Sequence, residues 1–90
     1  MADKVKMYVY REGTYEDAMG NEIVRIFSDK EKALRHMRRT VEKEFHCEFD
    51  ELEKLYQDNQ DAVIYPDYVE IPTGRDIYFY IVEEKAVDAA

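Results

Sequence analysis

The chain has little of several residue types on which common kinds of site depend. Its 90 residues include one cysteine, three glycines and two prolines. The single cysteine, Cys47, excludes an internal disulfide bond, and it cannot form a structural zinc site without other ligands. The few glycines form no G-x-x-x-x-G-K-[ST] or G-x-G-x-x-G motif, which excludes a glycine-rich phosphate-binding loop. We therefore expect no cofactor.

Long apolar runs are also missing. No apolar segment approaches the roughly 20 residues that cross a bilayer, and the N-terminal MADKVK lacks the apolar core of a signal peptide. We therefore expect a cytoplasmic protein that does not bind a membrane. The apolar fraction of 46% is typical of a folded chain, and the length predicts one domain over residues 1–90, with loose tails at 1–3 and 85–90.

Positive charge is scarce in the second half of the chain. The net charge is −8, with a net +1 in residues 1–45 and a net −9 in residues 46–90. Nucleic-acid-binding domains show the opposite balance, so direct binding to nucleic acid is not expected. An acidic half is suited to a basic surface on another protein. The alternative is that the charge only keeps the protein soluble.

Four segments have the alternating pattern or β-branched content of strands, and one has helical periodicity. The strand-like segments are residues 4–10, 22–27, 68–71 and 76–83, and the helical segment is residues 29–58. This ββαββ order predicts an α+β fold with a four-stranded, mainly antiparallel sheet and a helix on one face. We expect the spatial order 2-1-4-3. Pro66 cannot donate to a ladder, so it places the third strand at a sheet edge.

The helical segment begins with capping chemistry and is longer than a sheet of this size. Ser28 and Glu31 have the spacing of a capping box. One helix over residues 29–58 would be about 45 Å long, whereas the strands would span only about 23–33 Å. We therefore expect a bend or break near residues 46–50, or a second copy of the chain that covers the overhang.

Tyrosines alternate with aliphatic residues in the two most apolar strands. The predicted helix-facing positions of the sheet are Val5, Met7, Val9, Phe27, Ile77, Phe79 and Ile81. The opposite face would then carry Tyr8, Tyr10, Tyr78 and Tyr80, together with Val24, Ile26 and Val82. Tyrosine suits interfaces because its ring buries well while its hydroxyl finds a partner. We predict that these tyrosines bind a partner or a second copy, and the alternative is cross-strand pairing on a half-exposed sheet.

Two charged sets lie along the helical segment. The acidic set consists of Glu42, Glu44, Glu48, Glu51, Glu53, Asp58 and Asp61, and we predict that it binds a basic partner surface. The basic set consists of Lys32, Arg35, His36, Arg39 and Lys43. It predicts either a site for an anion or acidic partner, or a solvated helix face.

The sequence contains no recognisable reaction chemistry. His46 and Cys47 are adjacent, so on a helix they would point about 100° apart, which is poor for chelation. No H-E-x-x-H or C-x-x-C motif occurs. No two carboxylates are set in the contrasting environments that acid–base catalysis requires. We therefore predict no catalytic, cofactor-binding or metal-binding residue, and a protein that is not an enzyme.

A strand that ends in IFSDKEKALRHM resembles small uncharacterised bacterial and phage ββαββ domains, over Ile23 to about Met37. In those domains a short hairpin runs into a helix through an FSDKEKA-like junction. The small size, acidity and tyrosine content also resemble phage-encoded inhibitors of bacterial defence systems, including anti-CRISPR proteins. The resemblance implies a non-enzymatic inhibitor that occludes a basic nucleic-acid-binding surface of a host protein. The alternative is a homodimeric structural or sensor domain that pairs through the tyrosine-rich face.

Overall fold

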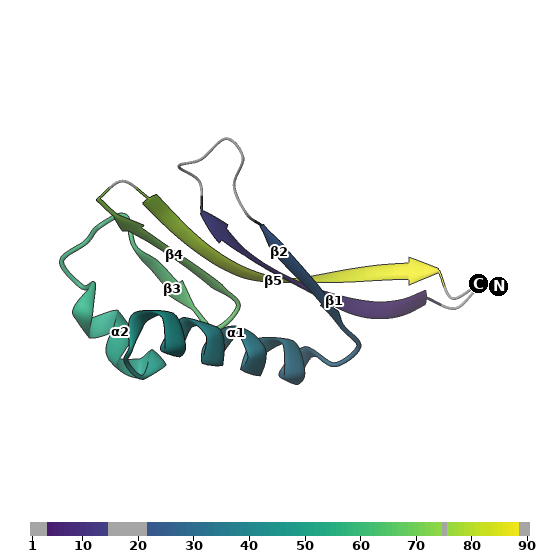
Figure 1. Cartoon of the computed structure of the whole chain (residues 1–90). Coiled ribbons are helices and arrows are strands. Elements are labelled where there is room, and N and C mark those ends of the chain that lie inside the picture. The colour runs from purple at the N-terminus through teal and green to yellow at the C-terminus, as the bar shows by residue number, and fades with distance from the viewer. Residues whose placement is uncertain (1–3, 15–21, 75, 89–90) are drawn as a thin grey trace.

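The computed structural model describes residues 4–14, 22–74 and 76–88 of the chain. Within these residues the elements are β1 (Lys4–Thr14), β2 (Ile23–Phe27), α1 (Lys30–Phe45), α2 (Phe49–Leu55), β3 (Val63–Tyr65), β4 (Tyr68–Thr73) and β5 (Asp76–Asp88). The strands form one antiparallel sheet in the order β2-β1-β5-β4-β3. Both helices lie on the same side of this sheet (Figure 1).

The α+β class and the antiparallel sheet are confirmed, but the expected number of strands is wrong. The described residues form five strands, and the predicted order 2-1-4-3 corresponds to β2-β1-β5-β4. The additional strand, β3, takes the edge position that was expected for β4. Pro66 lies in the turn between them, so its missing N–H does not confine β4 to the edge. Residues 85–88 belong to β5 and are not a loose tail.

The expected break in the helical segment is confirmed. α1 ends at Phe45, and the next residue, His46, adopts a left-handed conformation with φ 55°. α2 begins at Phe49, whose N–H donates to Glu42 Oε2 over 2.9 Å. The start of α1 differs from the prediction by one residue, because the cap is Asp29 and not Ser28. The Asp29 carboxylate accepts a hydrogen bond from the N–H of Glu31 over 2.9 Å, two residues away.

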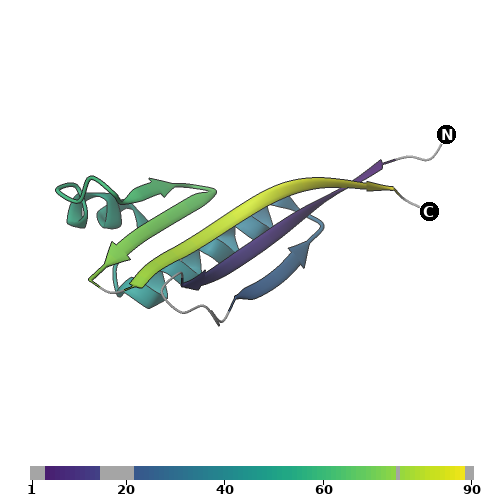
Figure 2. The same ribbon diagram turned by 90° about the horizontal axis from the view of Figure 1, so that it is seen from above.

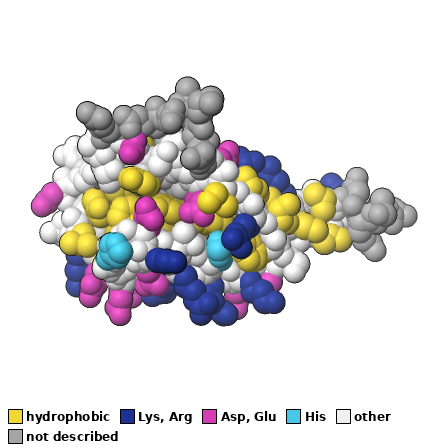
Figure 3. All heavy atoms as spheres, in the orientation of Figure 1, with side chains coloured by type: hydrophobic (Ala, Val, Ile, Leu, Met, Phe, Trp, Pro, Cys, Tyr) yellow, Lys and Arg dark blue, Asp and Glu magenta, His cyan; other side chains and the backbone are white. Residues whose placement is uncertain are grey.

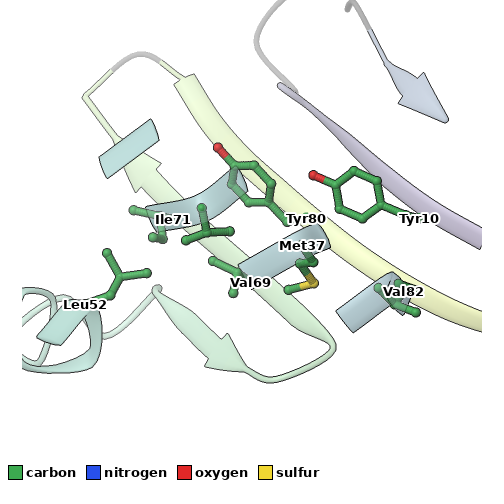
Figure 4. Close-up of a cluster of buried hydrophobic side chains, with 9 residues drawn as sticks. Tyr10, Met37, Leu52, Val69, Ile71, Tyr80 and Val82 are labelled. Carbon is green, nitrogen blue, oxygen red and sulfur yellow. The ribbon is translucent and has the colours of Figure 1, made fainter. Parts of the chain in front are cut away.

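The core shows that the predicted orientation of the sheet is wrong. Tyr10 is 0% exposed and Tyr80 is 3% exposed, and both lie beneath the helices. Figure 4 shows Tyr10, Tyr80 and Val82 projecting from the sheet toward Met37 of α1. Ile77, which was expected in the core, is 36% exposed. The alternation in β1 and β5 separates two sets of side chains, but both sets are apolar, so it does not decide which set meets the helices.

The molecule is elongated because β1 and β5 extend past the other elements. Its principal dimensions are 50 × 31 × 21 Å. The pairing of β1 with β5 runs from Lys4↔Asp88 to Thr14↔Tyr78, whereas β2 pairs only with residues 8–12 of β1. Residues 4–7 and 84–88 therefore form a two-stranded arm, which projects beyond the helices toward both termini (Figure 2).

Candidate interaction surfaces

The sheet has one face that neither α1 nor α2 covers, and we call it the open face. The pairs Tyr10↔Val82 and Val69↔Tyr80 place four buried side chains on the helix-covered face. Side chains alternate along a strand. The open face therefore consists of the odd-numbered positions of β1, β3 and β5 and the even-numbered positions of β2 and β4.

Most of the strongly exposed large apolar side chains lie on the open face. The described residues include eight of them, and six belong to this face, namely Val5, Val24, Ile26, Tyr65, Ile77 and Val87. Their exposed fractions range from 36% for Ile77 to 65% for Ile26. Figure 3 views the molecule from the side, and on the side in view charged side chains gather over the helices.

The open face is also broad, and its strand positions carry no net charge. Strand spacing and rise give the whole sheet, polar positions included, an in-plane area of roughly 600 Å². The charged strand positions of the open face are Arg11, Glu70, Glu83 and Lys85. Glu83 Oε2 lies 3.9 Å from Lys85 Nζ, and Arg11 Nε lies 3.7 Å from an oxygen of Glu22. The surface is therefore apolar and neutral in a chain whose net charge is −8.

A glycine seats an aromatic ring in the open face. Gly13 of β1 pairs with Phe79 of β5. A Cβ atom on Gly13 would lie 2.9 Å from Phe79 Cζ and 3.0 Å from Cε1, so the ring rests directly over the glycine backbone. Because of this contact, the Phe79 ring lies against the sheet backbone and does not project from the open face.

The predicted tyrosine interface is wrong for Tyr10 and Tyr80, because a partner cannot reach side chains beneath the helices. Burial raises the pKa of both phenols above the ordinary value. Tyr8 and Tyr78 are half-buried on the same side and pack against the core. The sequence pattern that could have shown which side of the sheet faces the helices is in β4. There, Val69 and Ile71 alternate with the polar Glu70 and with Pro72. Val69 and Ile71 stand opposite Tyr80 and Tyr78 in register, so β4 identifies the tyrosine side as the core side.

The acidic set divides into one structural residue and six exposed ones. Glu42 is held between the helices, since its carboxylate accepts from the Phe49 N–H and lies 3.8 Å from Arg38 Nε. The exposed members are Glu44, Glu48, Glu51, Glu53, Asp58 and Asp61. They come from the end of α1, from α2 and from the segment after it, at the end of the molecule away from the arm (Figure 1). The Glu42 carboxylate is thus engaged in contacts within the fold, whereas the side chains of the other six residues are exposed and accessible to a partner.

Four of the five residues of the basic set, all except Lys43, line a shallow pocket of about 340 Å³ between α1 and β2. Its lining includes Lys32, Arg35 and Arg39, which form no ion pair with any carboxylate of the described residues. His36 also lines it, but its ring packs 4.7 Å from that of Tyr10 and 5.4 Å from that of Phe27. Burial, together with the nearby Arg25, lowers the pKa of His36. His36 is therefore part of the core edge, and the pocket is an exposed groove with three cations.

The described residues offer no metal cluster. No group of three or more His, Cys, Asp or Glu side chains in this part of the chain is placed to hold an ion. Burial, with Glu51 and Glu42 nearby, raises the pKa of the Cys47 thiol. This lowers the fraction of the side chain that is present as the nucleophilic thiolate.

Neither described helix is long and apolar enough to span a membrane. The apolar open face, the exposed acidic residues and the basic groove are thus the surfaces on which a function can be argued. No protein-family model, curated protein or solved structure matches this chain.

Proposed function

We propose that this chain is a non-enzymatic protein-binding module that docks through its open face. The observation that supports the proposal is the concentration of exposed apolar side chains on one neutral sheet face. Scattered apolar residues are normal on a protein surface, but six of the eight strongly exposed large apolar side chains of the described residues lie on this one face, and such a concentration is typical of an interface. The apolar positions span four different strands, so a broad, flat partner surface fits this face better than a small ligand does.

A matched pair of variants tests this proposal. Ile26 on the open face and Leu55 on α2 are both 65% exposed, so Ile26→Glu and Leu55→Glu place the same charge at equally accessible positions. In affinity capture from a lysate of the native host, wild type and Leu55→Glu should retain the same partner, and Ile26→Glu should lose it. Circular dichroism spectra should confirm that both variants fold. Equal capture by the two variants would contradict docking through the open face.

The exposed acidic residues support a second candidate, an inhibitor that occludes a basic nucleic-acid-binding surface of another protein. These six residues come from the end of α1, from α2 and from the segment after it, on the helix side of the molecule. Binding of this kind should weaken steeply when the salt concentration rises from about 50 to 500 mM, because exposed charges are screened. It should also weaken in Glu51→Lys and Glu53→Lys and not in Ile26→Glu. The reverse pattern would exclude this second candidate.

A further inference from the structure

We propose that the open face is occupied by a second copy of this chain, in a two-fold dimer whose sheets stack face to face. This inference rests on the proposed function and names its partner. In such a dimer the two sheets would lie about 10 Å apart. The helices of both copies would form the outer layers. Each side of the interface would be the same patch, as a two-fold dimer requires.

Charge favours this pairing over other contacts between copies. Two chains of net charge −8 repel each other. The strands of the open face carry two cations and two anions. Two copies of this face can therefore pack together without net electrostatic repulsion between their strand residues. The exposed acidic residues lie on or beside the helices, on the other side of the sheet. Stacking through the open faces therefore places the two acidic surfaces as far apart as the fold allows.

The area of the face is of the size that a stable dimer needs. A standard interface buries about 800 Å² of accessible surface on each partner. The in-plane area of roughly 600 Å² corresponds to a larger accessible surface, because side chains project from the sheet. Homodimer interfaces are also more apolar than other protein interfaces, which agrees with the six exposed apolar side chains of this face.

The arm gives a separate reason for a covering copy. A two-stranded ribbon is only marginally stable in water unless something packs on it. Val5 and Val87 pair across the arm, and they are 41% and 43% exposed on the same side as the open face. A second copy stacked on the open face would extend over this pair and supply the missing cover.

Sedimentation equilibrium of the full chain from about 1 to 200 μM tests the dimer. Wild type and Leu55→Glu should show twice the protomer mass of 10.8 kDa. Ile26→Glu and Ile77→Glu should raise the dissociation constant about a hundredfold or more, because each buries an unpaired carboxylate twice in a symmetric interface. Ile77 lies on the inner strand β5 and Ile26 on the edge strand β2, so only face-to-face stacking responds to both. Added salt should leave the association unchanged or strengthen it.

Three results would overturn the dimer. They are a wild-type monomer up to the highest concentration, a dimer that folded Ile26→Glu and Ile77→Glu both retain, and a dimer that salt weakens. The last is expected if the basic groove of one copy binds the acidic surface of another. If a glutamate variant fails to fold, Ile26→Thr and Ile77→Thr keep the β-branched shape and serve the same comparison. If wild type is monomeric but capture still depends on Ile26 and not on Leu55, the proposed function stands with a different protein as partner.

Discussion

The hydroxyl of Tyr10 lies beneath α1 and makes no hydrogen bond of good geometry with any described residue, although Thr40 and Glu12 lie within its reach. A buried hydroxyl without a partner costs free energy, whereas the ring around it contributes apolar packing. Tyr10→Phe should therefore change the free energy of unfolding at pH 7 by less than about 1 kcal/mol. A larger loss in urea denaturation would mean that Thr40 or Glu12 does bond the hydroxyl.

The burial of the Tyr10 and Tyr80 phenols predicts that the free energy of unfolding falls at alkaline pH. Tyr10 and Tyr80 have raised pKa values in the folded state, while the unfolded chain has the ordinary value of 10.0. Their stabilising effect is complete below pH 10 and is lost as the pH rises above 10, because only the unfolded chain then releases the protons. Each tyrosine should lower the free energy of unfolding by about 1.4 kcal/mol per pH unit in that range.

Tyr10→Phe provides the control for this pH effect. It removes one of the two tyrosines whose pKa is raised, so it should lower by about half the share of the slope of stability against pH above pH 10 that the two tyrosines contribute. The measurement is urea denaturation at several pH values from 9 to about 11.5. An unchanged slope would show that Tyr10 is ionised as easily in the folded chain as in the unfolded one.

At the scale of elements, the join between α1 and α2 depends on one carboxylate. α2 has no capping side chain of its own, since Glu48 makes no such hydrogen bond. Glu42 supplies the acceptor from the preceding helix. Glu42→Ala should therefore lower the free energy of unfolding by about 1 kcal/mol, as measured by urea denaturation. Glu42→Gln keeps an acceptor oxygen and should lose less.

A neighbouring acidic residue gives the matched control for Glu42. Glu44 is exposed and makes no hydrogen bond or ion pair with the described residues. Glu44→Ala removes the same charge from the same helix, so it should change the free energy of unfolding by only a few tenths of a kcal/mol. If the two alanine variants lost equal stability, the Phe49 hydrogen bond would not be what Glu42 contributes.

The sequence was sufficient for the elements that local chemistry decides. The break after Phe45 follows from a helix too long for its sheet, and the order of four strands follows from their apolar content and from antiparallel pairing of neighbours. It was not sufficient for the orientation of the sheet, because tyrosines and aliphatic residues in β1 and β5 are both able to fill a core. β3 was missed because its three residues, Val63–Tyr65, are too few to show alternation.

Because the prediction from sequence assigned the wrong face of β1 and β5 to the core, it also assigned the wrong side chains of these strands to the candidate interface. With Tyr10 and Tyr80 in the core, the aliphatic positions of β1 and β5 lie on the open face. The expectation of a sheet face away from the helices stays useful, and Val24 and Ile26 lie on it as predicted, but the side chains that β1 and β5 contribute to it are different. The acidic residues were placed on the surface correctly except for Glu42, because sequence alone does not show that a carboxylate spans a helix break.

At the scale of the whole molecule, the fold separates three kinds of surface. The open face is apolar and neutral, the end of the helix layer at α2 is acidic, and the groove between α1 and β2 is basic. In a dimer that pairs through the open faces, each of the two copies would expose its acidic surface and its basic groove to the solvent. The pairing and any second contact with another protein are therefore compatible with each other.

The arm allows a last test of whether the open face needs cover. Residues 4–7 and 84–87 lie outside the pairing with β2 and β4, and the Val82 N–H, which donates to the Asp67 carbonyl over 2.9 Å, marks where that support ends. The ion pair between Lys6 and Glu84 spans 3.9 Å and is more than half exposed, so it adds little stability. In the Ile26→Glu variant the amides of the arm should exchange hydrogen at least about tenfold faster than those of residues 8–12 and 78–82. In wild type at a concentration that favours the dimer this difference should shrink. Arm amides as protected in Ile26→Glu as the centre of the sheet would show that the ribbon is stable without a second copy.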